Sequence, residues 1–426
     1  MKLDSKIKKI LEFVWNSPYS SFYKDKYTKA GINLIKDINS MEDFKKLPYL
    51  TKDELVSSDP FSRFYLPWSE FGTVSISSGT TKNINSLSVV FRQQNLARQI
   101  YKDKGGKSRD DFHVTSIMKL LSPHQAAMHL LDRKRIKDNA VCVLGDINNL
   151  PLSAKIAAKL KIDLLVTSPT ALYFFIPFLE KEYSLDNIKR ISLIGEFCSK
   201  QKDLIFKKKF KNTRFIYNYG MSEAQGGAIG LSCGCLDTLS TNYFHKSSNY
   251  YYEVINSSGD SELFLTNLYK NGFPLIRYKT GDAIEVEDYD CGCGQKERFK
   301  ILGRINYDAL KIHGVFIYAD LVEKALLPFQ QYLSSPKFQL HVFEDLEKEK
   351  IIPRLKLQLI LKKGYQGKSE KLIKLIVKGF SEELYLSARR TLASLVSEEI
   401  FKPLEVEFIN SFPMSSKHKK IVSHLD

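Results

Sequence analysis

The fold of this chain is indicated most clearly by residues 162–194, which read IDLLVTSPTALYFFIPFLEKEYSLDNIKRISLI. A short apolar run is followed, after Ser-Pro, by an apolar-rich run of helical length and then by a second short apolar run. The alternation continues downstream and predicts strands at 162–167, 188–194 and 214–218 and helices at 170–182 and 200–210. Strands that alternate with helices favour a parallel or mixed sheet covered by helices. We therefore predict an α/β fold.

The regions outside this stretch have other patterns. Residues 1–60 are helical and loop-rich, and residues 71–78 (FGTVSISS) alternate like a strand. Residues 250–302 are typical of short antiparallel strands and predict a β-rich subdomain. After Gly303 the pattern becomes β-α-β-β-α-β, which predicts a small α+β domain.

Two domains follow from these changes of pattern. Residues 1–302 form a large N-terminal domain with mixed sheets, and residues 303–426 form a C-terminal lid. We expect the lid to move about a hinge near Gly303.

Composition limits the class of protein. The chain has 426 residues, of which 43% are hydrophobic and 26% charged, so it is globular rather than disordered. The start, MKLDSKIKKILEFVW, has no uninterrupted apolar core, so we expect no signal peptide. We also find no apolar run of the ~18 residues that a membrane span needs. The expected location is the cytoplasm.

The chain is basic, with 64 Lys and Arg against 48 Asp and Glu and a net charge of +16. Scattered lysines account for much of the excess, and no basic-aromatic module of a nucleic-acid binder is present. We therefore expect no nucleic-acid partner. An anionic small molecule or an acidic carrier protein explains the charge equally well.

The first segment with a chemical signature is Ser75-Ile-Ser-Ser-Gly-Thr-Thr-Lys82. Small residues allow backbone N–H groups to approach phosphate oxygens, hydroxyls add donors, and lysine adds charge. The segment lacks the spacing of a Walker A loop. Taken alone, it is compatible either with a phosphate-binding loop or with an ordinary Ser/Thr-rich turn.

Further motifs follow in order along the chain. They are Tyr217-Asn-Tyr-Gly-Met-Ser-Glu223, Pro274-Leu-Ile-Arg-Tyr-Lys-Thr-Gly-Asp282 and Leu302-Gly-Arg304. Together with the Ser75–Lys82 segment, they resemble the core motifs of the acyl-adenylate-forming superfamily. Phe22-Tyr23, Leu47-Pro-Tyr-Leu-Thr-Lys52 and Thr167-Ser-Pro-Thr-Ala-Leu172 are similar to its phenylacetate–CoA ligase branch. The resemblance therefore covers nearly the whole chain.

The resemblance implies an enzyme that activates a carboxylic acid. The acid, which we expect to be an aryl acid, attacks the α-phosphate of ATP, pyrophosphate leaves, and an acyl-AMP forms. A thioester with coenzyme A follows. The alternatives are transfer to a carrier-protein thiol or an amine, and a nucleotide-binding relative that does not turn over.

The resemblance also implies roles for individual residues. The β- and γ-phosphates would be held by Ser77, Ser78, Gly79, Thr80, Thr81 and Lys82. Ser222 would contact the α-phosphate and Glu223 would bind Mg²⁺, whose usual ligands are carboxylate and phosphate oxygens. Other nucleotide contacts would come from Tyr219 at the adenine, Asp282 at both ribose hydroxyls, Arg304 at the ribose or phosphates, Gly220, and the Gly195-Glu196 loop. For Asp282 the alternative is a turn residue after Gly281.

The chain departs from the family pattern at three places. Its phosphate loop ends Thr81-Lys82-Asn83, where the family usually has Thr-Gly-Lys. Its hinge segment is one residue longer than the common family pattern, which leaves open whether Asp308 is the pivot. Its C-terminal tail, Phe412-Pro-Met-Ser-Ser-Lys-His-Lys-Lys420, has no Gly-Lys pair, and we choose Lys419 as the catalytic lysine from its distance to Pro413.

Four of the six cysteines stand in two Cys-Gly-Cys pairs. Zinc takes four tetrahedral thiolate or imidazole ligands, and two short pairs from separate loops supply such a set. The candidate ligands, five for four positions, are Cys233, Cys235, His245, Cys291 and Cys293. Some members of the resembled branch carry a structural zinc here. The alternative is a set of reduced surface thiols.

Overall fold

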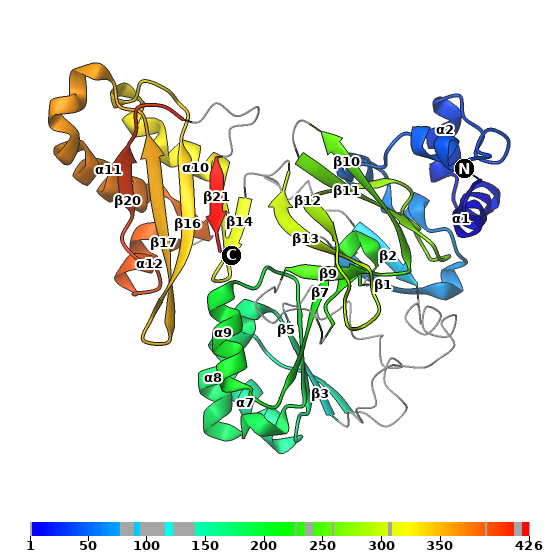
Figure 1. Ribbon diagram of the computed structural model, residues 1–426, viewed down its shortest axis with the longest axis horizontal. Helices are drawn as coiled ribbons and strands as arrows, with labels where there is room; N and C mark the ends of the chain where they lie inside the picture. Colours follow the sequence, from blue (N-terminus) through cyan, green and yellow to red (C-terminus); the bar gives the residue numbers. More distant parts are fainter. Residues whose placement is uncertain are drawn as a thin grey trace. The chain divides into compact units, whose positions relative to one another are not determined.

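The computed structural model describes residues 2–76, 89–93, 116–121, 141–225, 228–233, 235, 242–257, 260–305, 309–387, 390–412 and 420–425 (Figure 1). The chain divides into two compact units. One comprises Met1–Gly195, Phe210–Asp237 and Asn242–Gly303, and the other comprises Glu196–Lys209, Thr238–Thr241 and Arg304–Asp426. Within these described ranges, no helix is long and apolar enough to cross a membrane.

The first unit is built on one large sheet, whose described strands run in the order β10-β11-β12-β13-β9-β8-β7-β6-β5-β3-β4. Its parallel half consists of β3 (Ser116–Leu120), β4 (Val141–Leu144), β5 (Leu164–Thr167), β6 (Arg190–Ile194) and β7 (Arg214–Tyr219). The three strands predicted at 162–167, 188–194 and 214–218 are β5, β6 and β7, which are thus neighbours. The sequence did not predict β3, because buried Ser116 and Lys119 interrupt its apolar run.

Helices cover the parallel half of the sheet. Their N-caps and apolar faces follow from the local sequence. These helices are α7 (Leu150–Lys159) and α8 (Pro169–Glu182), which pack together in Figure 1. The Ser168 side chain accepts the Ala171 N–H and caps α8, whose first residue is a proline. Phe175 and Leu179 are fully buried on its inner face. The predicted α/β class is confirmed.

The antiparallel half continues the same sheet. It consists of β8 (Gly230–Leu231), β9 (Tyr243–Lys246), β10 (Tyr250–Ser257), β11 (Asp260–Asn267), β12 (Tyr278–Asp288) and β13 (Glu297–Arg304). The β-rich region predicted at 250–302 is therefore present, but it joins the main sheet through β9 and β8. This continuity places the end of β7 and the middle of β12 in one rigid scaffold.

The N-terminal segment of the first unit forms four short α-helices within residues 2–76, and side chains cap all of them except α2. They are α1 (Ser5–Asn16), α2 (Phe22–Lys29), α3 (Met41–Lys46) and α4 (Lys52–Ser57), and a hairpin of β1 (Phe71–Ile76) and β2 (Val89–Gln93) follows. Ser40 and Thr51 form capping boxes with Asp43 and Glu54. Tyr23 anchors this segment, because its hydroxyl donates to Pro274 O at 2.8 Å.

The second unit contains a separate four-stranded sheet in the order β20-β17-β16-β21. Its strands and hairpins are β14 (Ala309–Ile312), β15 (Val315–Tyr318), β16 (Gln339–Glu347), β17 (Lys350–Leu359), β18 (Tyr385–Ser387), β19 (Arg390–Thr391), β20 (Glu405–Phe408) and β21 (Ile421–His424). Its helices are α9 (Lys200–Lys209), α10 (Ala319–Leu326), α11 (Ser369–Glu383) and α12 (Leu392–Ser397). Leu340, Leu355, Leu357, Ile376 and Phe380 form the centre of its core. The α+β pattern expected after Gly303 is therefore present.

Candidate functional site

Tyr219 and Asp282 lie in direct contact, although they come from different halves of the large sheet. Tyr219 is the last residue of β7, and Asp282 lies within β12. The Tyr219 hydroxyl donates a hydrogen bond to Asp282 Oδ2. The Tyr219 ring is held by Phe244 and Phe299, whose ring centroids lie 6.0 and 6.1 Å away. The structure thus brings together the residues expected at the adenine and at the ribose.

Asp282 is almost enclosed, with 4% of its surface exposed. Its backbone N–H donates to Thr280 Oγ1 at 3.1 Å, and Thr280 Oγ1 donates to Leu263 O at 2.7 Å. Gly281, between them, has a φ of +76°, which favours glycine. These contacts fix the direction of the Asp282 side chain before any ligand arrives.

The motif after β7 forms a tight turn. Ser222–Ala224 is a 3₁₀ turn that follows Gly220 and Met221, and it leaves Ser222 partly exposed and Glu223 buried. Gln225 closes the turn with a φ of +54°. The Gln225 Nε2 group donates to Asn271 Oδ1 at 3.1 Å and to Phe273 O at 3.0 Å. Sequence reasoning missed Gln225, because only tertiary contact reveals that its amide anchors the turn to another loop.

Gly195 directly follows β6, has a φ of +83° and belongs to the first unit. Glu196 and Arg304 belong to the second unit. There the Glu196 carboxylate forms an ion pair with Lys311 Nζ at 3.0 Å, and Arg304 is exposed at the end of β13. Tyr219, Gly220, Ser222, Glu223 and Asp282 all lie in the first unit. Ser77, Ser78, Gly79, Thr80, Thr81, Lys82, Asp308 and Lys419 lie outside the described residues.

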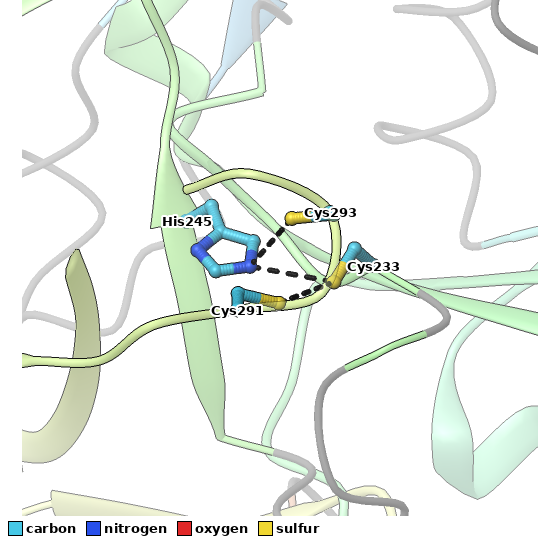
Figure 2. A group of neighbouring side chains, drawn as sticks. All are labelled: Cys233, His245, Cys291 and Cys293. Carbon is cyan, nitrogen blue, oxygen red and sulfur yellow. Dashed lines mark hydrogen bonds between the residues drawn. The ribbon is translucent and has the colours of Figure 1, made fainter. Parts of the chain in front are cut away.

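A cysteine–histidine cluster lies on the antiparallel half of the sheet. Its members are Cys233, His245, Cys291 and Cys293, and their donor atoms all lie within 4.8 Å of one another. His245 Nε2 is 3.3 Å from Cys233 Sγ and 3.4 Å from Cys293 Sγ, and Cys233 Sγ is 3.5 Å from Cys291 Sγ. Figure 2 shows the sulfur atoms gathered on the Nε2 side of the ring. Tetrahedral zinc bonds require such separations to be about 3.5–3.8 Å.

The surroundings orient the cluster toward a common centre. His245, on β9, is 6% exposed, and its Nδ1 lies 2.9 Å from Glu297 O, so Nδ1–H donates and Nε2 faces the sulfurs. A turn at Cys291–Gly294 is closed by a hydrogen bond from Gly294 N–H to Cys291 O at 2.7 Å. Cys235 is exposed and is not a member of the cluster. Of the five candidate ligands, Cys235 is therefore the one that the geometry leaves out.

Comparisons with known proteins agree with the motifs. No protein-family model matches the chain. The phenylacetate-coenzyme A ligase of Escherichia coli (strain K12) is 24% identical over 335 residues, which cover 75% of this chain and 74% of the relative. The enzyme of the same name from Pseudomonas putida is 24% identical over 400 residues, which cover 87% and 86%.

Two crystal structures of 2-hydroxyisobutyryl-CoA ligase have the same fold. One, in complex with 2-HIB-AMP and CoA, gives a TM-score of 0.60 at 15% identity and covers 98% of this chain and 88% of that chain. The other, in the postadenylation state with R3-HIB-AMP, gives 0.58 at 16% with the same coverage. The resemblance of this chain to the phenylacetate–CoA ligase branch of the acyl-adenylate-forming superfamily is therefore confirmed, by its sequence relatives and by its fold.

Proposed function

We propose that this protein is an ATP-dependent ligase that converts a carboxylic acid to an acyl-AMP and then to a coenzyme A thioester. The observation that carries the proposal is the contact between Tyr219 and Asp282, with the Ser222–Glu223 turn directly after β7. Relatives named as phenylacetate-coenzyme A ligases match over most of their length, which favours an aryl acid as substrate and coenzyme A as acceptor. The cytoplasm supplies both ATP and coenzyme A.

The chemistry explains why these residue types are needed. A carboxylate is a poor acceptor for a thiol, because its leaving group would be oxide, so its oxygen first attacks the α-phosphate of ATP and displaces pyrophosphate. Catalysis of this step depends on positioning and on neutralising charge. In our proposal the Asp282 carboxylate accepts the ribose hydroxyls, the Tyr219 ring lies against the adenine, and the Ser222 hydroxyl donates to the α-phosphate.

The proposed Mg²⁺ site uses Glu223. A carboxylate beside the phosphate-binding serine is the kind of oxygen ligand that Mg²⁺ accepts together with substrate phosphates. Glu223 is 7% exposed, so its position is set by the protein rather than by solvent. Bound Mg²⁺ would supply positive charge where negative charge develops on the phosphates.

The remaining assignments concern the phosphate loop and the C-terminal region. We assign Ser77–Lys82 to the β- and γ-phosphates, and Gly195, Glu196, Gly220 and Arg304 to further nucleotide contacts. Residues 303–426 are proposed as a lid, which would carry Lys419 to the reacting carboxylate and phosphate. A lid of this kind excludes water and completes the site only after substrates have bound.

We assign a structural zinc ion to Cys233, His245, Cys291 and Cys293. Three thiols and one imidazole form a closed donor set of the type that zinc prefers, and a closed set leaves no position for a substrate. The ion would join the segment after β8 to β9 and to the loop between β12 and β13. It would therefore stabilise the antiparallel half of the sheet rather than take part in catalysis.

The direct test of the ligase proposal is ATP–pyrophosphate exchange with Mg²⁺ and a panel of aryl and alkyl acids, without coenzyme A. We expect exchange that depends on the acid, with phenylacetate and related aryl acids most active. Adding coenzyme A should then give a thioester, which mass spectrometry detects. Protein that binds ATP but shows no exchange with any acid would contradict the proposal.

A further inference from the structure

A β-bulge in β12 carries Asp282. On one side of it Phe264 pairs with Lys279, and on the other side Glu262 pairs with Ala283. The paired residues are two positions apart on β11 but four positions apart on β12. The three residues Thr280–Asp282 therefore stand opposite the single residue Leu263, outside the regular ladder, and bulges redirect side chains next to active sites.

The bulge removes ladder partners from buried backbone groups, and Glu262 replaces one of them. Gly281 N–H donates to Glu262 Oε1 at 3.1 Å, whereas a regular strand would offer it a backbone carbonyl of β11. Glu262 is 1% exposed and Asp282 is 4% exposed, so water does not supply this acceptor. A buried N–H group without a partner is costly, and the Glu262 carboxylate therefore fixes the bulge at the residue directly before Asp282.

The charge of Glu262 is compensated within the same structure. Lys279 Nζ lies 3.4 Å from Glu262 Oε2, and Lys279 belongs to the segment that the bulge interrupts. Glu262 Oε1 thus accepts from the backbone of Gly281, inside the bulge. Glu262 Oε2 faces the side chain of Lys279, the residue directly before the bulge. A hydrogen bond to an ionised carboxylate is shorter and stronger than one to a neutral acceptor. Both oxygens of one buried side chain therefore hold the two arms of the bulge.

From this geometry we infer that Glu262 is a positioning residue, which holds the Thr280–Asp282 bulge so that the Asp282 carboxylate faces the nucleotide ribose. The inference rests on the proposed function, because it takes the ribose as the group that Asp282 accepts. Tyr219 restrains the same carboxylate from the other side, through its hydrogen bond to Oδ2. Glu262 itself touches no substrate and acts through the backbone of Gly281.

The test uses Glu262→Ala and Glu262→Gln in the full chain, with Glu287→Gln as the matched control. Glu287 lies on β12, the strand that carries the bulge, and it pairs with Arg298 away from the bulge. The measured quantities are the dissociation constants for MgATP and for 3′-deoxy-ATP, and the thermal unfolding temperature. Glutamine keeps an acceptor oxygen for Gly281 N–H, whereas alanine removes it.

We expect Glu262→Ala to bind MgATP about tenfold or more weakly and to lose most of its preference for ATP over 3′-deoxy-ATP. Glu262→Gln should keep most of that preference, and Glu287→Gln should keep all of it. A role in stability alone would lower the unfolding temperature of Glu262→Ala and leave the preference unchanged, which would overturn the inference. If Glu262→Ala does not fold, Glu262→Asp takes its place, because the shorter side chain withdraws the carboxylate from Gly281 N–H. An unchanged preference for ATP over 3′-deoxy-ATP in that variant overturns the inference equally.

The outcome separates this inference from the proposed function. Wild-type protein that prefers ATP to 3′-deoxy-ATP but catalyses no exchange would contradict the ligase activity and still allow the role of Glu262 to be measured. Exchange in the wild type with no change of ribose preference in Glu262→Ala would contradict only the role of Glu262. Wild-type protein that does not bind ATP would overturn both.

Discussion

The Asp282 region and the cysteine–histidine cluster lie on the same half of one sheet, yet they are held together in different ways. Around Asp282, neighbouring polar groups bind one another: Tyr219 donates to Asp282, Thr280 to Leu263 O, and Gly281 N–H to Glu262. In the cluster, three sulfur atoms and one imidazole nitrogen lie within 4.8 Å of one another, and the Cys233–His245, Cys293–His245 and Cys233–Cys291 pairs lie 3.3–3.5 Å apart. Thiols are weak hydrogen-bonding groups.

This difference indicates what each region requires. The Asp282 region is organised by the chain itself, because its polar groups already bind one another. The cluster brings together soft donors with little mutual attraction, and in our proposal a zinc ion would hold them. The first three predictions that follow test this comparison and the last concerns a group in the second unit. They run from the largest expected effect to the smallest.

Removing the metal should have the largest effect. We expect purified protein to contain one zinc ion, and Cys291→Ser or a strong chelator to remove it and to destabilise the first unit by several kcal/mol, since apparent binding energies of structural zinc reach about 10–16 kcal/mol in small peptides. Metal analysis and calorimetry measure this. Cys235→Ser is the control and should keep both the ion and the stability. Metal-free protein of unchanged stability would remove the distinction between the two regions.

The start of β12 should depend on a buried ion pair between two side chains rather than on a metal ion. Arg277, directly before β12, is buried with a φ of +47°, and its guanidinium binds Glu253 through Nε and Nη2 at 2.9–3.1 Å. Glu253→Gln would leave that charge uncompensated and should lower the free energy of unfolding by about 3–5 kcal/mol. Urea denaturation measures it. Glu253→Leu combined with Arg277→Met should recover much of the loss, and a single variant as stable as wild type would contradict the prediction.

Asp282→Asn should affect ligand binding more than folding. The amide keeps the size of the side chain but loses the charge that strengthens hydrogen bonds to the ribose, which are worth about 1.5–3 kcal/mol. We expect the KM for ATP in the exchange assay to rise about ten- to a hundredfold, with the KM for the acid nearly unchanged. An equal rise in both constants would indicate a general disturbance of the site.

Acid should act on the cysteine–histidine cluster, because protonation of thiolates and imidazole releases a bound metal. The second unit contains a further group that responds to acid. His313, in the β14–β15 turn, is 8% exposed, and burial, with a contribution from Lys202, lowers its pKa to about 3. The unfolded chain binds a proton near pH 6.5 that the folded chain does not bind. Stability from neutral His313 is therefore complete above pH 6.5 and decreases as the pH falls toward 3, by at most about 1.4 kcal/mol per pH unit.

His313→Asn isolates this contribution. Asparagine tolerates the φ of +45° found at position 313, so the turn should be preserved. We expect the unfolding free energies of the two proteins, measured by urea at several pH values, to diverge below pH 6.5, with the wild type losing more. Curves that stay parallel would show that His313 does not contribute, and the acid sensitivity would then belong to the cluster and the carboxylates.

Much of the fold was predictable because its signals are local. The segments at 162–167, 170–182 and 188–194 became β5, α8 and β6, since apolar run length and an N-cap serine followed by proline act over a few residues. β3 was missed, because its polar residues are buried only through contacts with distant strands. The continuity of the β-rich region with the main sheet was also missed, since strand pairing between distant segments leaves no local pattern.

The residues of the candidate site also divide into those that the sequence predicts and those that only the tertiary structure reveals. From the sequence, Tyr219, Ser222, Glu223 and Asp282 were predicted as site residues because their motifs resemble those of a known family. The two Cys-Gly-Cys pairs and His245 limited the candidate metal ligands to five, because residue type and spacing indicate metal binding directly. Only the tertiary structure separated Cys235 from the other four, and only it placed Glu262 beneath Gly281 and Gln225 against Asn271. These choices depend on which strands become neighbours and where a bulge interrupts their pairing. Contacts of this kind are decided by the packing of the whole sheet, which no short stretch of sequence contains.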